Sequence, residues 1–470
     1  MNPENRDQET AGPVYAPTPL TTAWSVDLGN RLNGTLVHTN INGTIGLLLP
    51  AAPTTPSPTA PQNQYVQSAV DLITLLYSCA TAVAKGDKEL VNKVLERICS
   101  SLASDDVRGP LHRLASSFAD ALALRVVQPW QGVCRALQLQ KTTPASAAAA
   151  ARRQFAEICP FLRLAGTTTN YAIIDAARTE RNAVLHVVDL GGADHDQWLL
   201  LLHLFAKRPG AGAHDQILRL TIVNEEDEFL SVTGALLARE AESLHIGFQF
   251  HPVKLHINEL LSSIEPLGVR NGEALVIVST LQLHRLLAEE FAEMVARPHD
   301  KKGKAQANAT MSRADALLRD LAELSPKLMV VTEQEANHND EFMARFENAL
   351  KYYGALFDAL EESVPARGST IERANMEQCL LLQEIRDIVA CEGAQRRERH
   401  ERMEKWAERM KAAGFASVAM SADAVAQTVM LGQMVTGCSR AYRVSSENDV
   451  CFFIRWRDFP MFSVSTWRAV

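Results

Sequence analysis

Apolar residues at helical spacing dominate the chain from about residue 63 to 180. The run KELVNKVLERICSSL (88–102) carries apolar side chains three or four positions apart, which places them on one helical face. These are Val91, Val94, Leu95, Ile98 and Leu102. The segment at 111–127 repeats the spacing, and AVDLITLLYSCATAV (69–83) is apolar nearly all round. A further helix is expected between Pro144 and Pro160. These faces either pack together as a bundle or bind a partner.

After residue 184 the pattern changes to short β-branched runs separated by amphipathic helices. The predicted strands are 185–189, 218–223, 248–253, 274–280 and 327–333. The predicted helices are 196–208, 228–244, 312–324, 341–363 and 376–414. This alternation is typical of a parallel sheet with helices on both faces.

The last predicted element is a hairpin, because two apolar runs in 450–467 flank the turn RDFP. The fold class is therefore α/β: a Rossmann-like parallel sheet of the methyltransferase type, with a terminal antiparallel hairpin and an N-terminal helical cap.

The chain divides into a tail and one compact unit. Residues 1–62 have no helical or strand periodicity and contain PAAPTTPSPTAPQ (50–62), so they are expected to form a disordered tail rich in Pro and Thr, with a short apolar segment at 45–50. Residues 63–470 are expected to form one domain, with a helical cap at 63–180 and the Rossmann-like core at 181–470.

Composition narrows the function classes. With 47 Lys and Arg against 55 Asp and Glu, the formal net charge is −8, which does not favour direct binding to DNA. No CxxC pair occurs among the eight cysteines, so they are expected to be reduced residues of an intracellular protein. No membrane segment is expected. No compact basic cluster marks a nuclear import signal, so the sequence leaves the route into the nucleus open.

The turn LHVVDLGGADHDQW (185–198) raises the question of a cofactor. A methyltransferase-type site would use Asp189, Gly191 and Gly192 at this turn and Glu225 after the second strand. Ala193 stands where a further glycine is usual, and Asp194 and Asp196 would add negative charge beside a cofactor carboxylate. We therefore expect no cofactor, no metal and no catalytic residue. A small-molecule-binding or S-adenosylmethionine-dependent enzyme is the alternative.

Several segments together resemble the GRAS family of plant regulatory proteins. The turn at 185–198 resembles the family's VHIID motif, although Gly191-Gly192 replace residues that are more often acidic and polar. VVTEQEANHN (330–339) and RERHERMEKW (397–406) resemble its PFYRE region, and WRDFPMFSVSTW (456–467) its SAW motif. LQLHRLL (281–287) resembles its LHxLL element, and the leucine-rich helices at 66–165 and 230–265 match its two leucine heptad regions.

The resemblance singles out residues as well as motifs. The motif residues are His186, Asp189, Gln197, Trp198, Glu333, Asn337, His338, Asn339, Arg397, Glu398, His400, Glu401, Trp456 and Trp467. The candidates for partner binding are Val91, Leu95, Ile98, Leu283, His284 and Leu287. His186 and Asp189 are expected to hold the strand end and its loop, and Trp198 to pack on the sheet or cap. Residues 397–401 are expected on a salt-bridged helix surface or at a partner or inter-domain contact.

The resemblance also implies a function. Family members act mostly as transcriptional regulators or co-regulators through protein partners, here expected in gibberellin-linked growth and root development. The implied partners are DELLA-type regulators, zinc-finger DNA-binding transcription factors and other GRAS proteins, in homo- or heterodimers. Contact with DNA would be indirect, and the implied location is the nucleus, with the cytoplasm second. The tail holds no DELLA-type sequence, so the gibberellin-receptor contact of that class is not implied.

Overall fold

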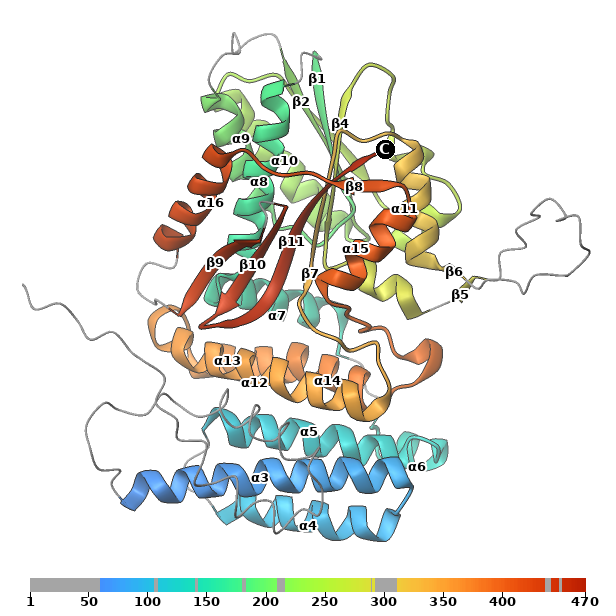
Figure 1. Ribbon diagram of the computed structural model, residues 1–470, viewed down its shortest axis with the longest axis vertical. Helices are drawn as coiled ribbons and strands as arrows, with labels where there is room; N and C mark the ends of the chain where they lie inside the picture. The colour runs from blue at the N-terminus through green and yellow to red at the C-terminus, as the bar shows by residue number, and fades with distance from the viewer. Residues whose placement is uncertain are drawn as a thin grey trace, which may run out of the picture.

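One mixed sheet organises the molecule, and its strand order is β3-β2-β1-β4-β7-β11-β10-β9, with β8 paired to β11 (Figure 1). The computed structural model describes residues 60–104, 109–139, 143–179, 183–208, 216–288, 290–291, 311–435, 441–447 and 450–470. The five parallel strands are β1 (Val184–Asp189), β2 (Ile217–Val223), β3 (Phe248–Val253), β4 (Ala274–Thr280) and β7 (Leu328–Gln334). They match the five predicted strands, so the Rossmann-like core is confirmed.

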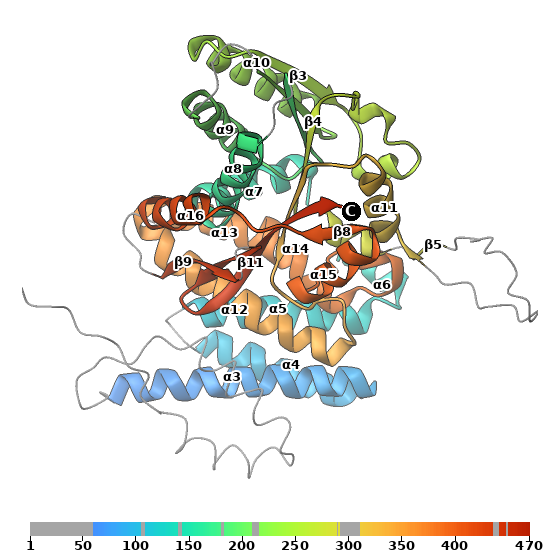
Figure 2. The same ribbon diagram turned by 45° about the horizontal axis from the view of Figure 1, so that its top comes forward.

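The central strands are buried on both faces, because alternate side chains enter two different hydrophobic cores. In β1, Leu185 and Val187 belong to one core and Val188 to the other. The first face is covered by α8 (Phe161–Thr179), α9 (His195–Lys207) and α10 (Asp227–Ser243), and α16 (Ala422–Val435) packs on α8. The second face is covered by α11 (Arg313–Glu323) and α15 (Met403–Ala412) (Figure 2).

The predicted terminal hairpin is present. Strands β10 (Cys451–Trp456) and β11 (Phe459–Ala469) pair antiparallel, and β11 also pairs antiparallel with β7. Two further strands, which the sequence pattern did not indicate, extend this part of the sheet: β8 (Phe415–Ser417) on β11 and β9 (Tyr442–Glu447) on β10. Short polar strands such as β9 lack the apolar run that a pattern search needs.

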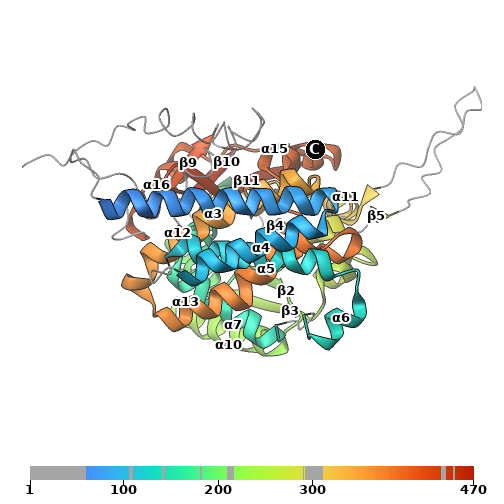
Figure 3. The same ribbon diagram turned by 90° about the horizontal axis from the view of Figure 1, so that it is seen from below.

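The helical cap is built from two distant parts of the chain. Figures 1 and 3 show α3 (Ala60–Lys85), α4 (Lys88–Ser104) and α5 (Pro110–Val127) stacked on α12 (Phe342–Arg367), α13 (Thr370–Met376) and α14 (Leu382–Ala390). The second group lies between the first and the sheet. In contrast, α8 lies before residue 180 but packs on the sheet. The spatial boundary of the cap therefore does not follow the division at residue 180.

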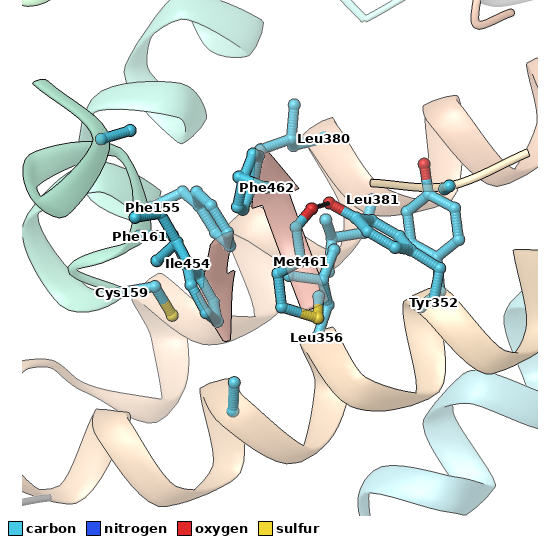
Figure 4. Packing of buried hydrophobic residues seen from close by; sticks show 14 of the residues in the cluster. Phe155, Cys159, Phe161, Tyr352, Leu356, Leu380, Leu381, Ile454, Met461 and Phe462 are labelled. Atoms are coloured by element: carbon cyan, nitrogen blue, oxygen red, sulfur yellow. Dashed lines mark hydrogen bonds between the residues drawn. The ribbon is translucent and has the colours of Figure 1, made fainter. Parts of the chain in front are cut away.

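Helix α12 joins cap and sheet because it is apolar on opposite sides. Phe346 makes edge-to-face contacts with Tyr77 of α3 and Phe118 of α5, at centroid distances of 5.7 and 5.6 Å. On its other side, Tyr352 donates a hydrogen bond to the Met461 carbonyl of β11 at 3.0 Å. Figure 4 shows Met461 and the adjacent Phe462 packed among side chains of α7 (Ala145–Ile158), α8 and α12.

The prediction of one continuous helix over 376–414 is wrong. A five-residue π-helical segment, Glu377–Leu381, joins α13 to α14, and the helix then ends at Cys391. After one 3-10 turn, Gly393–Gln395, residues 396–402 are not helical, and α15 begins at Met403.

The non-helical segment is held by side chains instead of a helical ladder. Asp387 of α14 accepts hydrogen bonds from the backbone N–H groups of Arg397 and Glu398, both at 2.8 Å. Glu398, His400 and Glu401 are buried. The expected salt-bridged helix surface over 397–401 is therefore wrong, since helical counting cannot detect partners that a distant helix supplies.

The N-terminal helix α3 begins at Ala60, three residues before the predicted domain start. The remaining tail, with its apolar segment at 45–50, lies outside the described residues. One helical stretch of the described chain, Gln67–Lys85, is long and apolar enough to cross a membrane. However, 56% of its apolar 18-residue segment is buried inside the protein. A buried core helix passes the same test, so this is weak evidence for a membrane segment.

Candidate functional site

The glycine turn after β1 is held by Asp189, which is fully buried. Its carboxylate accepts hydrogen bonds from the Gly191 N–H at 2.9 Å and from the Trp198 indole N–H at 3.2 Å. Burial raises the pKa of Asp189 to about 7, although both hydrogen bonds act in the opposite direction. The turn also pairs with β4, since the Thr280 N–H donates to the Gly191 carbonyl at 3.3 Å.

The space beside this turn is filled by the chain itself. Gly191 and Gly192 have positive φ angles, +106° and +90°. A Cβ atom on Gly192 would lie 1.8 Å from the Thr280 carbonyl oxygen and 2.9 Å from the Gln282 amide nitrogen. The second glycine therefore serves a close approach of the β1 and β4 ends.

Glu225 and the motif residue Gln197 make contacts of their own. Glu225 is exposed and lies 3.2 Å from the His256 imidazole in an ion pair. Gln197 packs against Gly166 of α8, and its backbone carbonyl accepts a hydrogen bond from Asn170 at 2.7 Å. A pocket of about 400 Å³ lies between α10 and β3, and neither Asp189 nor the two glycines line it.

His186 ties β1 to its neighbours inside the sheet. Its Nε2 lies 2.8 Å from the Thr221 hydroxyl of β2, and its Nδ1 lies 2.9 Å from the Glu273 carboxylate before β4. Arg219 donates to the same carboxylate at 2.8 Å. Burial and the Arg219 charge lower the pKa of His186 to about 4, so this imidazole is neutral at physiological pH. These contacts fix the strand; nothing in them suggests a ligand.

The motif residues far apart in the sequence meet in a second place, where β4 and β7 end. We name this set the His284 network: His284, Glu333, His338, Glu398 and His400, all buried. The two ring nitrogens of His284 lie 2.7 Å from Glu333 and 2.9 Å from Glu398. Burial alone would lower the pKa of His284, but the two carboxylates outweigh it and raise the pKa to about 9.

Glu333 also holds the backbone of the LHxLL-like element. Its carboxylate also accepts the Leu283 backbone N–H at 2.9 Å, which fixes the start of the 3-10 helix η3 (Leu283–Ala288). Arg285, on the same short helix, reaches Glu398 at 3.2 Å. The network therefore connects the LHxLL-like element, the end of β7 and the segment after α14.

The two remaining histidines extend the network toward α12. The ring Nδ1 atoms of His338 and His400 lie 3.0 Å apart. The backbone N–H of His338 donates to the backbone carbonyl of His400 at 2.8 Å. His338 stacks on Tyr353 of α12, with centroids 5.9 Å apart. Burial lowers the pKa of His338 to about 3 and that of His400 well below its usual value, so both imidazoles are neutral.

The rim of the network is polar and more accessible. The Asn339 amide donates to Glu401 at 2.7 Å, and Glu401 also binds Arg409 of α15 at 2.7 Å. Asn337 donates to Asp340 at 3.1 Å within its own loop. Of the three motif residues Asn337, Asn339 and Arg397, Arg397 alone is exposed, and the two asparagines are half-buried.

The two tryptophans of the SAW-like motif are interior residues. The Trp456 indole donates to Asp358 of α12 at 2.7 Å, and the Trp467 indole donates to Ser465 at 2.9 Å. Both side chains are buried. They hold the terminal hairpin to the cap and to the second core.

Most partner-binding candidates are core residues, which corrects the prediction that they lie on a contact surface. Val91 and Ile98 of α4 are buried, as are Leu283, His284 and Leu287 of η3. Leu95 is half-buried against the core. The helical faces were identified correctly, but periodicity shows only that a face is apolar. It does not show whether the same chain covers that face.

Sequence reasoning missed three groups that complete these sites: Thr280 and Gln282 at the glycine turn, and Asp387 beneath the RERHE segment. Arg285 was also passed over, although a His-Arg pair inside the apolar run LQLHRLL was a usable signal. No sequence signal identified Asp387, because its partners lie across a non-helical break.

Comparison with known proteins places this geometry in a family. Residues 72–468 match the GRAS domain family. The chain is 36% identical to Scarecrow-like protein 3 of Arabidopsis thaliana, over 85% of this chain and 89% of that protein. This similarity confirms the resemblance that SPKLMVVTEQEANHND (325–340) and FSVSTWR (462–468) show to that relative. The DELLA protein RGL3 of the same plant is 32% identical, over 86% of this chain and 70% of that protein.

A solved structure agrees with the sequence relatives. The crystal structure of SCL7 from Oryza sativa has a TM-score of 0.67 at 28% identity, covering 84% of this chain and 99% of that one. Because the family match spans most of the chain and the relatives above 30% identity cover more than two thirds of it, the protein belongs to the GRAS family and is a plant GRAS regulator.

Proposed function

We propose that this protein regulates transcription through protein partners, in gibberellin-linked growth and root development, and that it acts in the nucleus. Its similarity to Scarecrow-like protein 3 and to DELLA proteins supports this assignment. The proposed partners are DELLA-type regulators, zinc-finger DNA-binding proteins and other GRAS proteins. The net charge of −8 favours recruitment to promoters by such a zinc-finger partner over direct DNA binding.

The observation that carries the proposal is a group of exposed apolar side chains at one end of the cap, here called the cap-end patch. It consists of Leu90 at the start of α4 and Trp130, Val133 and Leu137 at and beside α6 (Gln131–Ala136), which are 40–64% exposed. The Lys88 ammonium lies 4.8 Å from the Trp130 ring centroid, so the two helices meet there. Exposed apolar groups of this kind favour a protein partner.

A charge or truncation in the cap-end patch is expected to weaken partner binding without unfolding the chain. Trp130→Ala should weaken binding by about 2 kcal/mol or more, roughly 30-fold, as buried tryptophans at interface centres do. Leu90→Glu should act in the same direction. The measurement is a pull-down or calorimetric titration with a DELLA or zinc-finger partner, alongside thermal melting of each variant.

Two variants serve as controls. Ile371 on α13 is 75% exposed outside the patch, so Ile371→Glu should leave both binding and stability unchanged. Ile98 is fully buried, so Ile98→Glu should unfold the cap and lose binding for that reason. The partner surface must lie elsewhere if Trp130→Ala and Leu90→Glu both bind normally.

We further propose that the protein is not an enzyme. Ala193 in place of a further glycine supports this, and so do Asp194 and Asp196, which would add negative charge beside a cofactor carboxylate. Calorimetric titration with S-adenosylmethionine is expected to be flat. Micromolar binding that Asp189→Ala abolishes would instead favour the methyltransferase-like alternative, with Asp189, Gly191, Gly192 and Glu225 as its residues.

A further inference from the structure

Three members of the His284 network bring possible metal-ligand atoms close together. His284, Glu398 and His400 each offer one donor atom, an imidazole nitrogen or a carboxylate oxygen. These three atoms lie within 4.8 Å of one another. Nε2 of His284 lies 2.9 Å from Oε2 of Glu398, and Nε2 of His400 lies 3.5 Å from the same oxygen. All three residues are buried, and they come from two segments more than a hundred residues apart in the sequence.

We propose that His284, Glu398 and His400 bind one Zn²⁺ ion. Two imidazoles and one carboxylate form a ligand set that zinc commonly uses, with a fourth position left for water. Ligand atoms about 2.0–2.1 Å from a tetrahedral ion lie about 3.3 Å from one another. The two spacings around Glu398 fall on either side of that value, and all three donor atoms lie within 4.8 Å of one another, so side-chain rotation brings them into range.

The outer contacts of both histidines suit ligation through Nε2. Nδ1 of His284 is held by Glu333 at 2.7 Å, which is the carboxylate–histidine arrangement found behind many metal ligands. Nδ1 of His400 is held by Nδ1 of His338 at 3.0 Å. Nε2 of His400 is buried and makes no hydrogen bond, although it faces Glu398. A cation between these two atoms gives this nitrogen a partner.

The neighbouring charges favour a dication. Glu384 and Asp387 of α14 are two half-buried acids nearby, and Asp387 accepts the Glu398 backbone N–H at 2.8 Å. Tyr353 donates a hydrogen bond to Glu384 at 2.9 Å. Arg285 also contacts Glu398, through its other carboxylate oxygen, which leaves Oε2 toward the histidines. The ion would lower the repulsion among these carboxylates.

Ligation changes the protonation of one residue. In the metal-free chain both nitrogens of His284 face carboxylates, which as ions only accept hydrogen bonds, so both nitrogens carry protons. When the ion binds, a Zn–N bond forms at Nε2 and the proton on that atom passes to solvent. The Nδ1–H bond to Glu333 remains. The His400 ring, tilted 27° to that of His284 at a centroid distance of 4.1 Å, must rotate slightly to join.

The test uses the full chain without a histidine tag, because the buried site must be loaded as the chain folds. Protein refolded with Zn²⁺ and then passed through a chelating column is expected to retain about one ion per chain, measured by mass spectrometry. Glu398→Gln and His400→Gln should reduce this to background. Glu333→Gln should weaken zinc affinity roughly 10–100-fold. Co²⁺ in place of Zn²⁺ should give the visible absorption of a tetrahedral site.

A matched control is His203→Gln, since His203 is exposed and pairs with Glu240 outside the network; it should retain the ion. The wild-type protein decides the question even when the ligand variants do not fold. A folded wild-type chain that retains no zinc and gives no cobalt spectrum overturns the proposal and leaves a purely ionic network. Zinc retained equally by folded His400→Gln and Glu398→Gln also overturns it.

Discussion

Gly192→Ala is expected to prevent the chain from folding, or to destabilise it by more than about 4 kcal/mol, which is exceptional for one methyl group. The added Cβ would lie 1.8 Å from the backbone oxygen of Thr280. A backbone atom cannot move aside as a side chain can, so the ends of β1 and β4 would have to separate. The measurement is soluble yield, followed by urea unfolding of any folded product.

Gly272→Ala is the control for this experiment. Gly272 has a φ angle of +88°, close to the +90° of Gly192, but a Cβ there would meet nothing within 4 Å. It should therefore show only the cost of the left-handed backbone, about 1–2 kcal/mol. Equal effects of the two substitutions would mean that the Thr280 carbonyl does not restrict the side chain at position 192.

Glu333→Ala is expected to destabilise the fold by about 3–5 kcal/mol, as removal of one partner of a buried ion pair does. The substitution leaves the His284 ring nitrogen and the Leu283 backbone N–H without an acceptor, and both are buried. It also loosens η3 from β7. The measurement is urea unfolding in zinc-free buffers. The change in the free energy of unfolding then reports the loss of the Glu333 contacts without any effect of bound metal.

The matched control is Glu408→Ala on α15. Glu408 pairs with Lys405 at 2.8 Å, close to the 2.7 Å of Glu333 and His284, but both partners are 64–68% exposed. Water screens this pair, so its loss should change the unfolding midpoint very little. A small effect of Glu333→Ala, similar to that of Glu408→Ala, would show that the His284 network does not stabilise the fold.

These two contacts bear on how a Rossmann-like fold serves a regulator. At the glycine turn, Gly192 lies against the Thr280 carbonyl at the end of β4. At the ends of β4 and β7, where open α/β sheets bind ligands, the chain's own charged groups fill the space. The side chains proposed above for partner contact, those of the cap-end patch, are exposed, and so is Arg397.

The sequence alone determined the strand plan. The strands β1, β2, β4 and β7 are mainly apolar runs, because both of their faces are covered, and such a run is visible without any tertiary information. The edge strand β3 is more exposed, and alternating apolar and polar residues marked it instead. The hairpin was visible for a similar reason, since two apolar runs flank one turn. The family followed from motifs whose residues are contiguous, such as VVTEQEANHN and RERHERMEKW.

The tertiary structure alone decided which polar residues meet and which apolar faces are covered. Glu333 and His284 are 49 residues apart, and Glu398 is 114 residues beyond His284, so no local spacing could pair them. The RERHE segment reads as helix because helical propensity is local, whereas the Asp387 carboxylate that holds it extended comes from another element. Likewise, Ile98 and Leu90 lie on the same helix with the same kind of side chain. Only the packing of α4 against the rest of the cap buries the first and exposes the second, because burial depends on the neighbours that the folded chain supplies.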